Sequence, residues 1–122
     1  MSLRPRLLLW CLGDQSERYD VFAGAEHWGV TVLGADDEAL ARRFARADTE
    51  TIAPAEAELF GIAPVLRGGV AQFACRTFER RQAGDHLLII GEVLDCRVRA
   101  GAALTYFRSR YGRADEAESG SK

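Results

Sequence analysis

Short apolar segments alternate along the chain with polar or glycine-containing stretches, a pattern typical of a protein built mainly from β-strands. The first segment, Leu7–Leu12, is almost continuously apolar and lies between Pro5 and Gly13, which predicts a strand buried on both faces. The segment richest in β-branched residues, His86–Val98, predicts the strongest strand. Other strands are expected over residues 28–33 and 105–108. The β pattern also returns at Pro64 and, after a bulge or sharp bend at Gly68 and Gly69, alternates over residues 71–79.

One amphipathic helix is expected over Asp36–Ala47, because Leu40 and Phe44 are four residues apart and Asp36 is a suitable N-cap. A shorter helix is expected near residues 19–23, and residues 48–64 read as an irregular segment with one helical turn. Strands joined mainly by turns, with one good helix, predict a small barrel or curled sheet, which is a mainly β fold with flanking helices.

The chain has 122 residues, of which 48% are hydrophobic, and this suits one packed domain. We expect that domain over residues 1–113 and a frayed acidic tail over residues 114–122. The 16 Lys and Arg residues against 18 Asp and Glu residues give a net charge of −2. Such a balance provides no electrostatic reason to expect nucleic acid or a membrane surface as a partner.

Three widely separated cysteines, Cys11, Cys75 and Cys96, have no metal-ligand spacing, so buried thiols are expected and no metal site. The N-terminal residues lack the pattern of a signal peptide, and the run over residues 7–12 is too short to cross a bilayer. A cytoplasmic protein is therefore expected. No catalytic dyad or phosphate-binding glycine loop stands out.

A more specific indication comes from residues 84–93, which read Gly-Asp-His, four apolar residues, then Gly-Glu-Val. This stretch resembles the GDH-x(4)-GEV signature of the flavin reductase family. Three other segments resemble motifs of the same family in the same order: residues 30–45, residues 64–75 and residues 104–111.

The resemblance covers about residues 3–113 and implies an FMN-binding split β-barrel, commonly a homodimer. It also implies an oxidoreductase that passes hydride from NADH or NADPH to FMN or FAD, with a flavin-dependent monooxygenase as a candidate partner. A hydride donor needs no acid, base or metal, so few reactive side chains are expected.

The resemblance places the family's GDH histidine at His86, on the nicotinamide side of the flavin, next to Gly84 and Asp85. The residues alone allow a second interpretation, in which Gly84 and Asp85 supply turn chemistry and His86 caps a hairpin.

By the same resemblance, the loop containing Asp14, Gln15 and Ser16 faces the ribityl-phosphate end of FMN. A solvated loop is the alternative, because Asp14 would repel a phosphate. Arg43 is a candidate phosphate partner or a favourable charge at a helix C-terminus. Phe44 fits beside the flavin or in the core, and its spacing from Leu40 favours the core.

Arg108 and Tyr111 are candidates for binding the phosphates of flavin or NAD(P)H, or for contacting a partner subunit. A solvated basic face is the alternative interpretation for both residues.

The start of the chain departs from the family pattern. Residues 2–7 resemble a stretch that family members usually reach only after an N-terminal helix and two strands. We therefore expect either a truncated or misassigned start, or a natural short form that lacks part of its barrel. The alternative function is then a non-catalytic split-barrel module for dimerisation or ligand binding that has lost flavin binding along with those strands.

Overall fold

The structure is a computed structural model that describes residues 6–45 and 53–115, and β-strands dominate this part of the chain. The predicted mainly β fold is confirmed. In chain order the elements are β1 (Leu7–Gly13), α1 (Tyr19–Ala23), β2 (His27–Val32), the 3₁₀ turn η1 (Ala35–Asp37), α2 (Glu38–Ala45), the 3₁₀ turn η2 (Pro54–Glu56), β3 (Ala57–Phe60), β4 (Ala63–Leu66), β5 (Ala71–Ala83), β6 (His86–Val98), β7 (Ala103–Phe107) and β8 (Arg110–Ala114).

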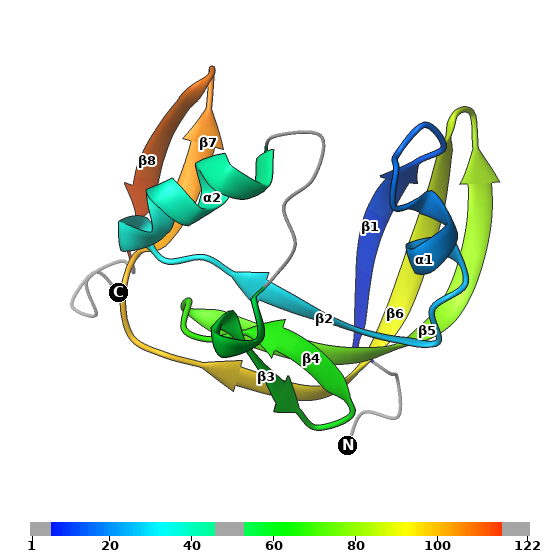
Figure 1. Cartoon of the computed structure of the whole chain (residues 1–122), viewed down its shortest axis with the longest axis horizontal. Helices are drawn as coiled ribbons and strands as arrows, with labels where there is room; N and C mark the ends of the chain where they lie inside the picture. Colours follow the sequence, from blue (N-terminus) through cyan, green and yellow to red (C-terminus); the bar gives the residue numbers. More distant parts are fainter. Residues whose placement is uncertain (1–5, 46–52, 116–122) are drawn as a thin grey trace, which may run out of the picture.

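The central sheet has the strand order β1-β6-β5-β2, and each neighbouring pair is antiparallel. Two further hairpins, β3–β4 and β7–β8, form two-stranded sheets of their own. The long strands β5 and β6 curve strongly, so the sheet bends through the whole molecule (Figure 1).

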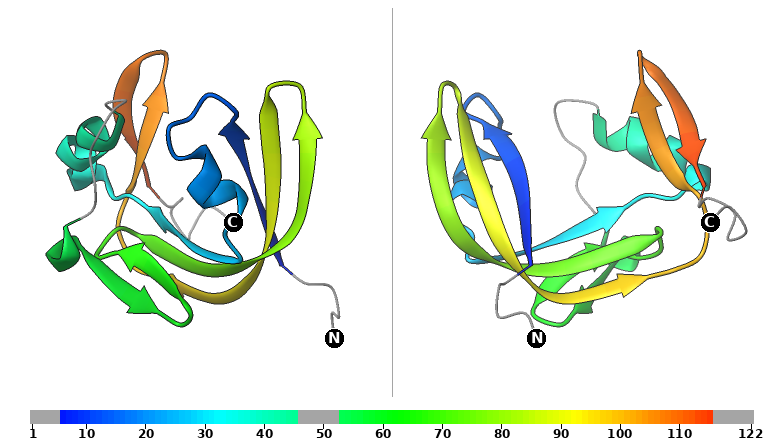
Figure 2. Two further views of the ribbon diagram at one scale, coloured as in Figure 1. Left: turned by 45° about the vertical axis from the view of Figure 1, so that its right-hand side comes forward. Right: turned by 180° about the vertical axis from the view of Figure 1, so that it is seen from behind.

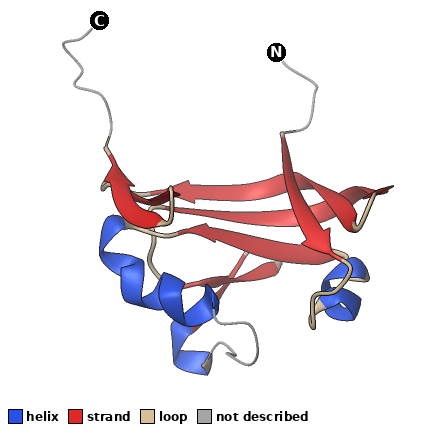
Figure 3. Cartoon of the chain, turned by 90° about the horizontal axis from the view of Figure 1, so that it is seen from above, coloured by secondary structure: helices blue, strands red, loops and turns tan. Residues whose placement is uncertain are grey.

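The chain has the shape of a U with two arms that extend to the same side (Figures 1 and 2). We call one of them the α1 arm, formed by β1, α1 and the ends of β5 and β6 at their shared turn. The other, the α2 arm, is formed by α2, β7 and β8, while β2, β3 and β4 lie between the arms. Seen from above, the helices lie on one side of the strand layer (Figure 3).

The buried core lies where the α1 arm meets the base of the U. It contains Trp28 and the fully buried Cys75 and Ile89, and aromatic rings of Trp10 and Phe22 pack against it. The Trp10 ring meets Phe22 edge-on with centroids 5.4 Å apart, the arrangement that aromatic quadrupoles favour.

Gly91 lies in the middle of β6, directly against the indole ring of Trp28. A Cβ atom at this position would collide with the ring of Trp28. Strand β6 runs on through Gly91 without interruption. The missing side chain therefore provides room for the indole.

A polar clip attaches the β3–β4 hairpin to the central sheet. The Gln72 side chain is almost completely buried, and its amide donates hydrogen bonds to the carbonyl oxygens of Leu66 at 2.6 Å and Gly68 at 3.2 Å. Its carbonyl oxygen accepts a hydrogen bond from Arg97 Nε at 2.6 Å, and Arg97 also bonds Glu58 at 2.6 Å. These partners satisfy the buried amide, whose desolvation would otherwise be costly.

The prediction that the first strand is buried on both faces is wrong. Only one face of strand β1 is covered: Leu7 and Leu9 lie on the other face and stay 46% and 60% exposed. Two of the three cysteines, predicted to be buried, are exposed for the same kind of reason: Cys11 and Cys96 occupy outward positions on β1 and β6. Only Cys75 is buried, and burial raises the pKa of its thiol to about 11.

The predicted helix over 36–47 is observed as η1 followed by α2, and its start is different from the prediction. The chain turns at Gly34, whose N–H donates to Asp37 Oδ2 at 2.8 Å, so Asp37 and not Asp36 is the capping carboxylate. Residues 46 and 47 lie outside the described residues.

Two strands were not expected. Residues 48–64 were read as irregular, but η2 leads into β3, which pairs with β4. The last predicted strand, observed as β7, is followed by β8. Ala114, which was predicted to begin the tail, is the last residue of β8. The rest of that tail lies outside the described residues from 116 onward.

Candidate functional site

The first group of predicted site residues lies at the turn between β5 and β6. Gly84 has a φ of +61°, a left-handed conformation that glycine adopts without strain. Asp85 Oδ1 lies 2.8 Å from His86 Nδ1. The hydrogen bond to His86 holds the pKa of the Asp85 carboxyl below its usual value. Because Nδ1 is occupied by this carboxylate, Nε2 is the ring nitrogen that remains for a ligand.

The loop after β1 lies directly beside this turn. Gly13 pairs with His86 in the sheet, and the N–H of Asp14 donates to the carbonyl oxygen of Asp85 at 3.0 Å. Within the loop, Ser16 Oγ accepts a hydrogen bond from the N–H of Arg18 at 3.2 Å.

The structure therefore brings six of the predicted residues together, although they are about seventy positions apart in sequence. We call this place the α1 tip, defined as residues 13–17 and 84–86. The predicted site residues it contains are Asp14, Gln15, Ser16, Gly84, Asp85 and His86.

The second group lies on the α2 arm. The guanidinium of Arg42 lies over the Tyr111 ring, 4.7 Å from its centroid, and the rings of Tyr106 and Tyr111 are 5.0 Å apart. These side chains line a polar cavity of about 410 Å³ together with Ala45 and Ser109. We call residues 106–111, which form the end of this arm, the α2 tip.

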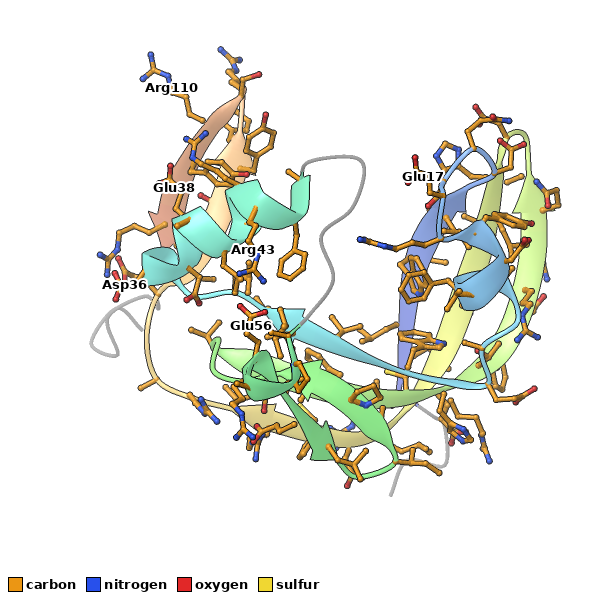
Figure 4. The ribbon with its side chains drawn as sticks, in the orientation of Figure 1. Glu17, Asp36, Glu38, Arg43, Glu56 and Arg110 are labelled. Carbon is orange, nitrogen blue, oxygen red and sulfur yellow. The ribbon has the colours of Figure 1, made fainter. Side chains whose placement is uncertain are left out.

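Arg43, a predicted phosphate ligand, binds a carboxylate of the chain itself. Its Nη2 lies 2.7 Å from Glu56 Oε1, and the guanidinium also lies 4.7 Å from the centroid of the Phe44 ring. The hydrogen bond from Arg43 is the main reason that the pKa of the Glu56 carboxyl is lowered. Figure 4 shows Arg43 and Glu56 pointing toward one another between α2 and η2. Phe44 is half-buried, so its assignment to the core or to a ligand stays a prediction.

The predicted residues thus form two groups on different arms. In Figure 4, Glu17 marks the α1 tip and Arg110 marks the α2 tip, at opposite sides of the U. One chain by itself does not bring His86 together with Arg108 and Tyr111.

An apolar cavity of about 430 Å³ lies between the arms, against α1, β2 and the β3–β4 hairpin. Sequence reasoning missed it, because its walls come from four elements that are distant along the chain. Its only signal in the sequence was the apolar character of the individual strands. The lining residues include Val21, Phe22, Trp28, Pro64, Val65 and Leu66.

Residues 6–45 and 53–115 contain no group of three or more His, Cys, Asp or Glu side chains placed to hold a metal ion. Across the same residues, no helix has the length and apolar character needed to span a membrane.

Comparison with known proteins gives the family. The model of the flavin reductase like domain matches residues 1–115, and the chain therefore belongs to this family. The earlier resemblance is confirmed.

Three curated relatives illustrate the range of the family. FMN reductase (NADH) SmoA of Agrobacterium fabrum is 36% identical over 115 residues, which is 93% of this chain and 65% of the relative. Actinorhodin polyketide dimerase of Streptomyces coelicolor is 35% identical over 91% of this chain and 64% of the relative. The reductase component of the flavin-dependent trigonelline monooxygenase of Acinetobacter baylyi is 32% identical over 91% of this chain and 36% of the relative. The chain thus spans less than two thirds of the length of each.

Among solved structures, the NADH:FAD oxidoreductase SgcE6 of Streptomyces globisporus, in complex with NAD and FAD fragments, superposes with a TM-score of 0.82 at 28% identity. The match covers 93% of this chain and 70% of that protein. The curled sheet described above is therefore the fold of flavin reductases.

The chemistry of the α1 tip fits part of a flavin site. The Ser16 hydroxyl and the Gln15 amide are suitable partners for the hydroxyl groups of a ribityl chain. Gly13 leaves one side of the imidazole open, since a Cβ there would lie 3.7 Å from His86 Nε2. The carboxylates of Asp14 and Asp85 are exposed and would repel a phosphate, so this tip suits the sugar and nicotinamide better than the phosphate.

Proposed function

We propose that this protein binds FMN or FAD and reduces it with hydride from NADH or NADPH. The main support is the family match together with the meeting of the GDH turn and the β1 loop at the α1 tip. Relatives named as NADH-dependent FMN reductase and as a monooxygenase reductase component favour this function over a non-catalytic module.

In this proposal the chain positions its ligands and performs no covalent chemistry. When bound, the flavin supplies the ring that accepts the hydride of the nicotinamide. His86 Nε2 accepts a hydrogen bond from the nicotinamide carboxamide, and Asp85 holds the imidazole through Nδ1. Gln15 and Ser16 bind the ribityl chain. Holding the two ligands in contact provides the rate enhancement, since orientation alone can lower a barrier by several kcal/mol.

We further propose that the protein acts as a homodimer in the cytoplasm and supplies reduced flavin to a monooxygenase. The trigonelline relative, which is named as the reductase component of such a system, is the reason for the last suggestion.

Flavin binding and NADH oxidation test the proposal. We expect the protein to quench the fluorescence of added FMN or FAD, and to oxidise NADH or NADPH faster when flavin is present. His86→Ala should lower kcat/KM for the nicotinamide about tenfold, because one orienting hydrogen bond is lost.

The matched control is His27→Ala, which removes the other histidine, at the start of β2. It should leave the KM for the nicotinamide unchanged. Folded protein that neither quenches flavin fluorescence nor oxidises NADH or NADPH would refute the proposal and favour the non-catalytic module.

A further inference from the structure

The backbone of the turn between β5 and β6 is held from two sides. From one side, the N–H of Asp14, in the loop after β1, donates to the carbonyl oxygen of Asp85 at 3.0 Å. From within β5, the side-chain amide of Gln82 donates from Nε2 to the carbonyl oxygens of Gly84 and His86, each at 3.1 Å. The carbonyl oxygens of three consecutive residues are therefore engaged, and one side chain accounts for two of them.

The two bonds from Gln82 use the full donor capacity of its amide. An NH2 group has two hydrogens, which is the number that two carbonyl oxygens require. Because both partners are acceptors, only the nitrogen end of the amide fits between them, and the oxygen end would be repelled. The side chain is exposed, and holding it in one conformation costs entropy. A glutamine that served solubility alone would gain nothing from this order.

The turn that Gln82 holds is short. Ala83 pairs with His86 in the sheet, so the loop consists of Gly84 and Asp85. Of these two residues only Gly84 has a positive φ, of +61°, which is the pattern of a type II′ turn. In such a short loop, rotation of one peptide group changes the direction of the side chains on both sides of it. The conformation of the turn therefore decides where the side chains of residues 85 and 86 point.

The contact between Asp85 and His86 depends on this conformation. Asp85 Oδ1 lies 2.8 Å from His86 Nδ1, although the two residues are neighbours in sequence. In an extended chain, neighbouring side chains point to opposite faces, so the turn is what brings the carboxylate back to the ring. The two side chains are 82% and 49% exposed, and packing therefore contributes little to their positions. The backbone that Gln82 binds is the main support of the imidazole.

We propose that Gln82 is a positioning residue for His86. By holding two carbonyl oxygens of the turn, it keeps the backbone in the conformation in which Asp85 accepts a hydrogen bond from His86 Nδ1. The ring proton then stays on Nδ1, and Nε2 is kept as an acceptor. The consequence for the reaction rests on the proposed function: Nε2 meets the nicotinamide carboxamide in the correct orientation only while Gln82 holds the turn.

The tautomer of His86 tests this positioning without any ligand. Side-chain ¹⁵N spectra distinguish a neutral imidazole protonated at Nδ1 from one protonated at Nε2, and we expect the Nδ1–H form to dominate in the wild-type protein. Gln82→Met keeps an unbranched side chain of similar length but removes both donors. The contact with Asp85 should loosen, and the population of the Nε2–H form should rise about threefold, the effect of weakening one hydrogen bond.

A conservative variant and a matched control accompany this measurement. Gln82→Lys should restore the wild-type tautomer, because an ammonium group offers three donors on a chain long enough to reach both carbonyl oxygens. Arg81→Met introduces the same side chain at the neighbouring position, where the guanidinium bonds Glu79 of the same strand at 3.1 Å. This control should leave the tautomer of His86 unchanged.

Steady-state kinetics with saturating flavin connects the positioning to the nicotinamide. Gln82→Met should raise the KM for NADH or NADPH about fivefold and change kcat by less than about twofold, because a binding contact is misaligned and no reacting group is lost. A residue that only stabilised the fold would lower the melting temperature and leave both constants of the folded protein unchanged. Arg81→Met should keep the wild-type KM.

The double variant separates an effect through His86 from a general one. If Gln82 acts by positioning the imidazole, Gln82→Met should raise the KM no further in a protein that already carries His86→Ala. Additive effects of the two substitutions would show that Gln82 acts on the nicotinamide by another route and would overturn the proposal.

The remaining outcomes also decide the matter. A wild-type tautomer or a wild-type KM in the Gln82→Met protein, no rescue by Gln82→Lys, or the same changes in the Arg81→Met protein would each refute the positioning role. Oxidation of NADH or NADPH together with a tautomer that does not respond to Gln82 would leave the proposed function intact. A tautomer that responds as described, in a protein that oxidises neither nicotinamide, would refute the proposed function and leave the positioning of His86 standing.

Discussion

The α1 arm is packed around the aromatic core of Trp10, Phe22 and Trp28, and the completely buried Ile89 comes from β6 beneath them. In the α2 arm every described residue of α2 keeps part of its surface exposed. That arm is held instead by backbone bonds from β7 to the segment before α2, and by stacking of Arg42 on Tyr111.

Hydrophobic burial contributes most of the stability of a protein, whereas exposed ion pairs and cation–π contacts contribute about 1 kcal/mol or less each. We therefore infer that the α1 arm holds its tip rigidly, as an orienting site requires. The α2 arm belongs to the less stable part of the molecule, where local opening costs less free energy.

The largest expected effect is on the α1 arm. Ile89→Ala removes a side chain with no exposed surface and leaves a cavity, which should lower the free energy of unfolding by about 2–5 kcal/mol. Urea denaturation measures this. Leu59→Ala, at a 75% exposed leucine of β3, is the control and should cost much less. Equal losses would show that the core is not where the structure places it.

Gly91→Ala tests the packing of the same core by adding a methyl group instead of removing side-chain atoms. The added methyl would collide with the Trp28 ring, and overpacking should cost about 1–3 kcal/mol of stability and change the near-UV circular dichroism. At Gly13 an added Cβ would make ordinary contacts, the nearest at 3.7 Å, so Gly13→Ala is the comparison. A Gly91→Ala protein as stable as Gly13→Ala would contradict the close approach of Trp28.

On the α2 arm the expected loss is smaller and local. Tyr111→Ala removes the ring that contacts both Arg42 and Tyr106, and should reduce stability by about 1 kcal/mol. Hydrogen exchange of the β7 and β8 amides should accelerate, while that of β5 and β6 stays unchanged. Tyr111→Phe keeps the ring and should restore most of the protection. Faster exchange throughout the protein would mean that the two arms unfold as one unit.

The smallest effect concerns pH. The hydrogen bond from Arg43 lowers the pKa of Glu56 from its ordinary value of 4.5 in the folded state. A depressed folded-state pKa stabilises the protein above pH 4.5, and this contribution is lost as the pH falls through the folded-state pKa. Glu56→Gln should therefore flatten part of the loss of stability below pH 4.5. If the free energy of unfolding falls in the same way below pH 4.5 in both proteins, the Arg43–Glu56 ion pair contributes nothing to stability.

The sequence was sufficient for one of the two long strands, β6, whereas β5 was predicted only over residues 71–79 and continues to Ala83. His86–Val98 was predicted with the bounds that β6 has, because its apolar pattern and the turn residues before it are local signals. Whether both faces of a strand are covered depends on how distant elements pack, so β1 was expected to be buried on both faces and has one exposed face. Strand β8 has one large apolar residue, Tyr111, beside arginines, a glycine and an alanine, and its pairing with β7 has no local signature.

For the candidate site, motifs gave the positions but not their grouping. Asp14–Ser16 and Gly84–His86 were proposed separately, and their contact follows from the register of β1 on β6. Arg43 was assigned to a phosphate or to the helix end. Its partner Glu56 lies on η2, within the segment expected to contain one helical turn, but no local pattern indicates that this turn lies beside α2. The apolar cavity could not be predicted from the sequence, because its prediction requires knowing how four elements pack.

In the proposed function, the α1 tip binds the flavin. Adding FMN to ¹⁵N-labelled protein and following the backbone amide signals tests this most directly. We predict that the amides of residues 13–17 and 84–86 shift in proportion to the fraction of flavin bound, and that His86→Ala reduces the shifts produced by a nicotinamide added afterwards. Flavin binding that leaves these amides unchanged while signals elsewhere move would contradict the account.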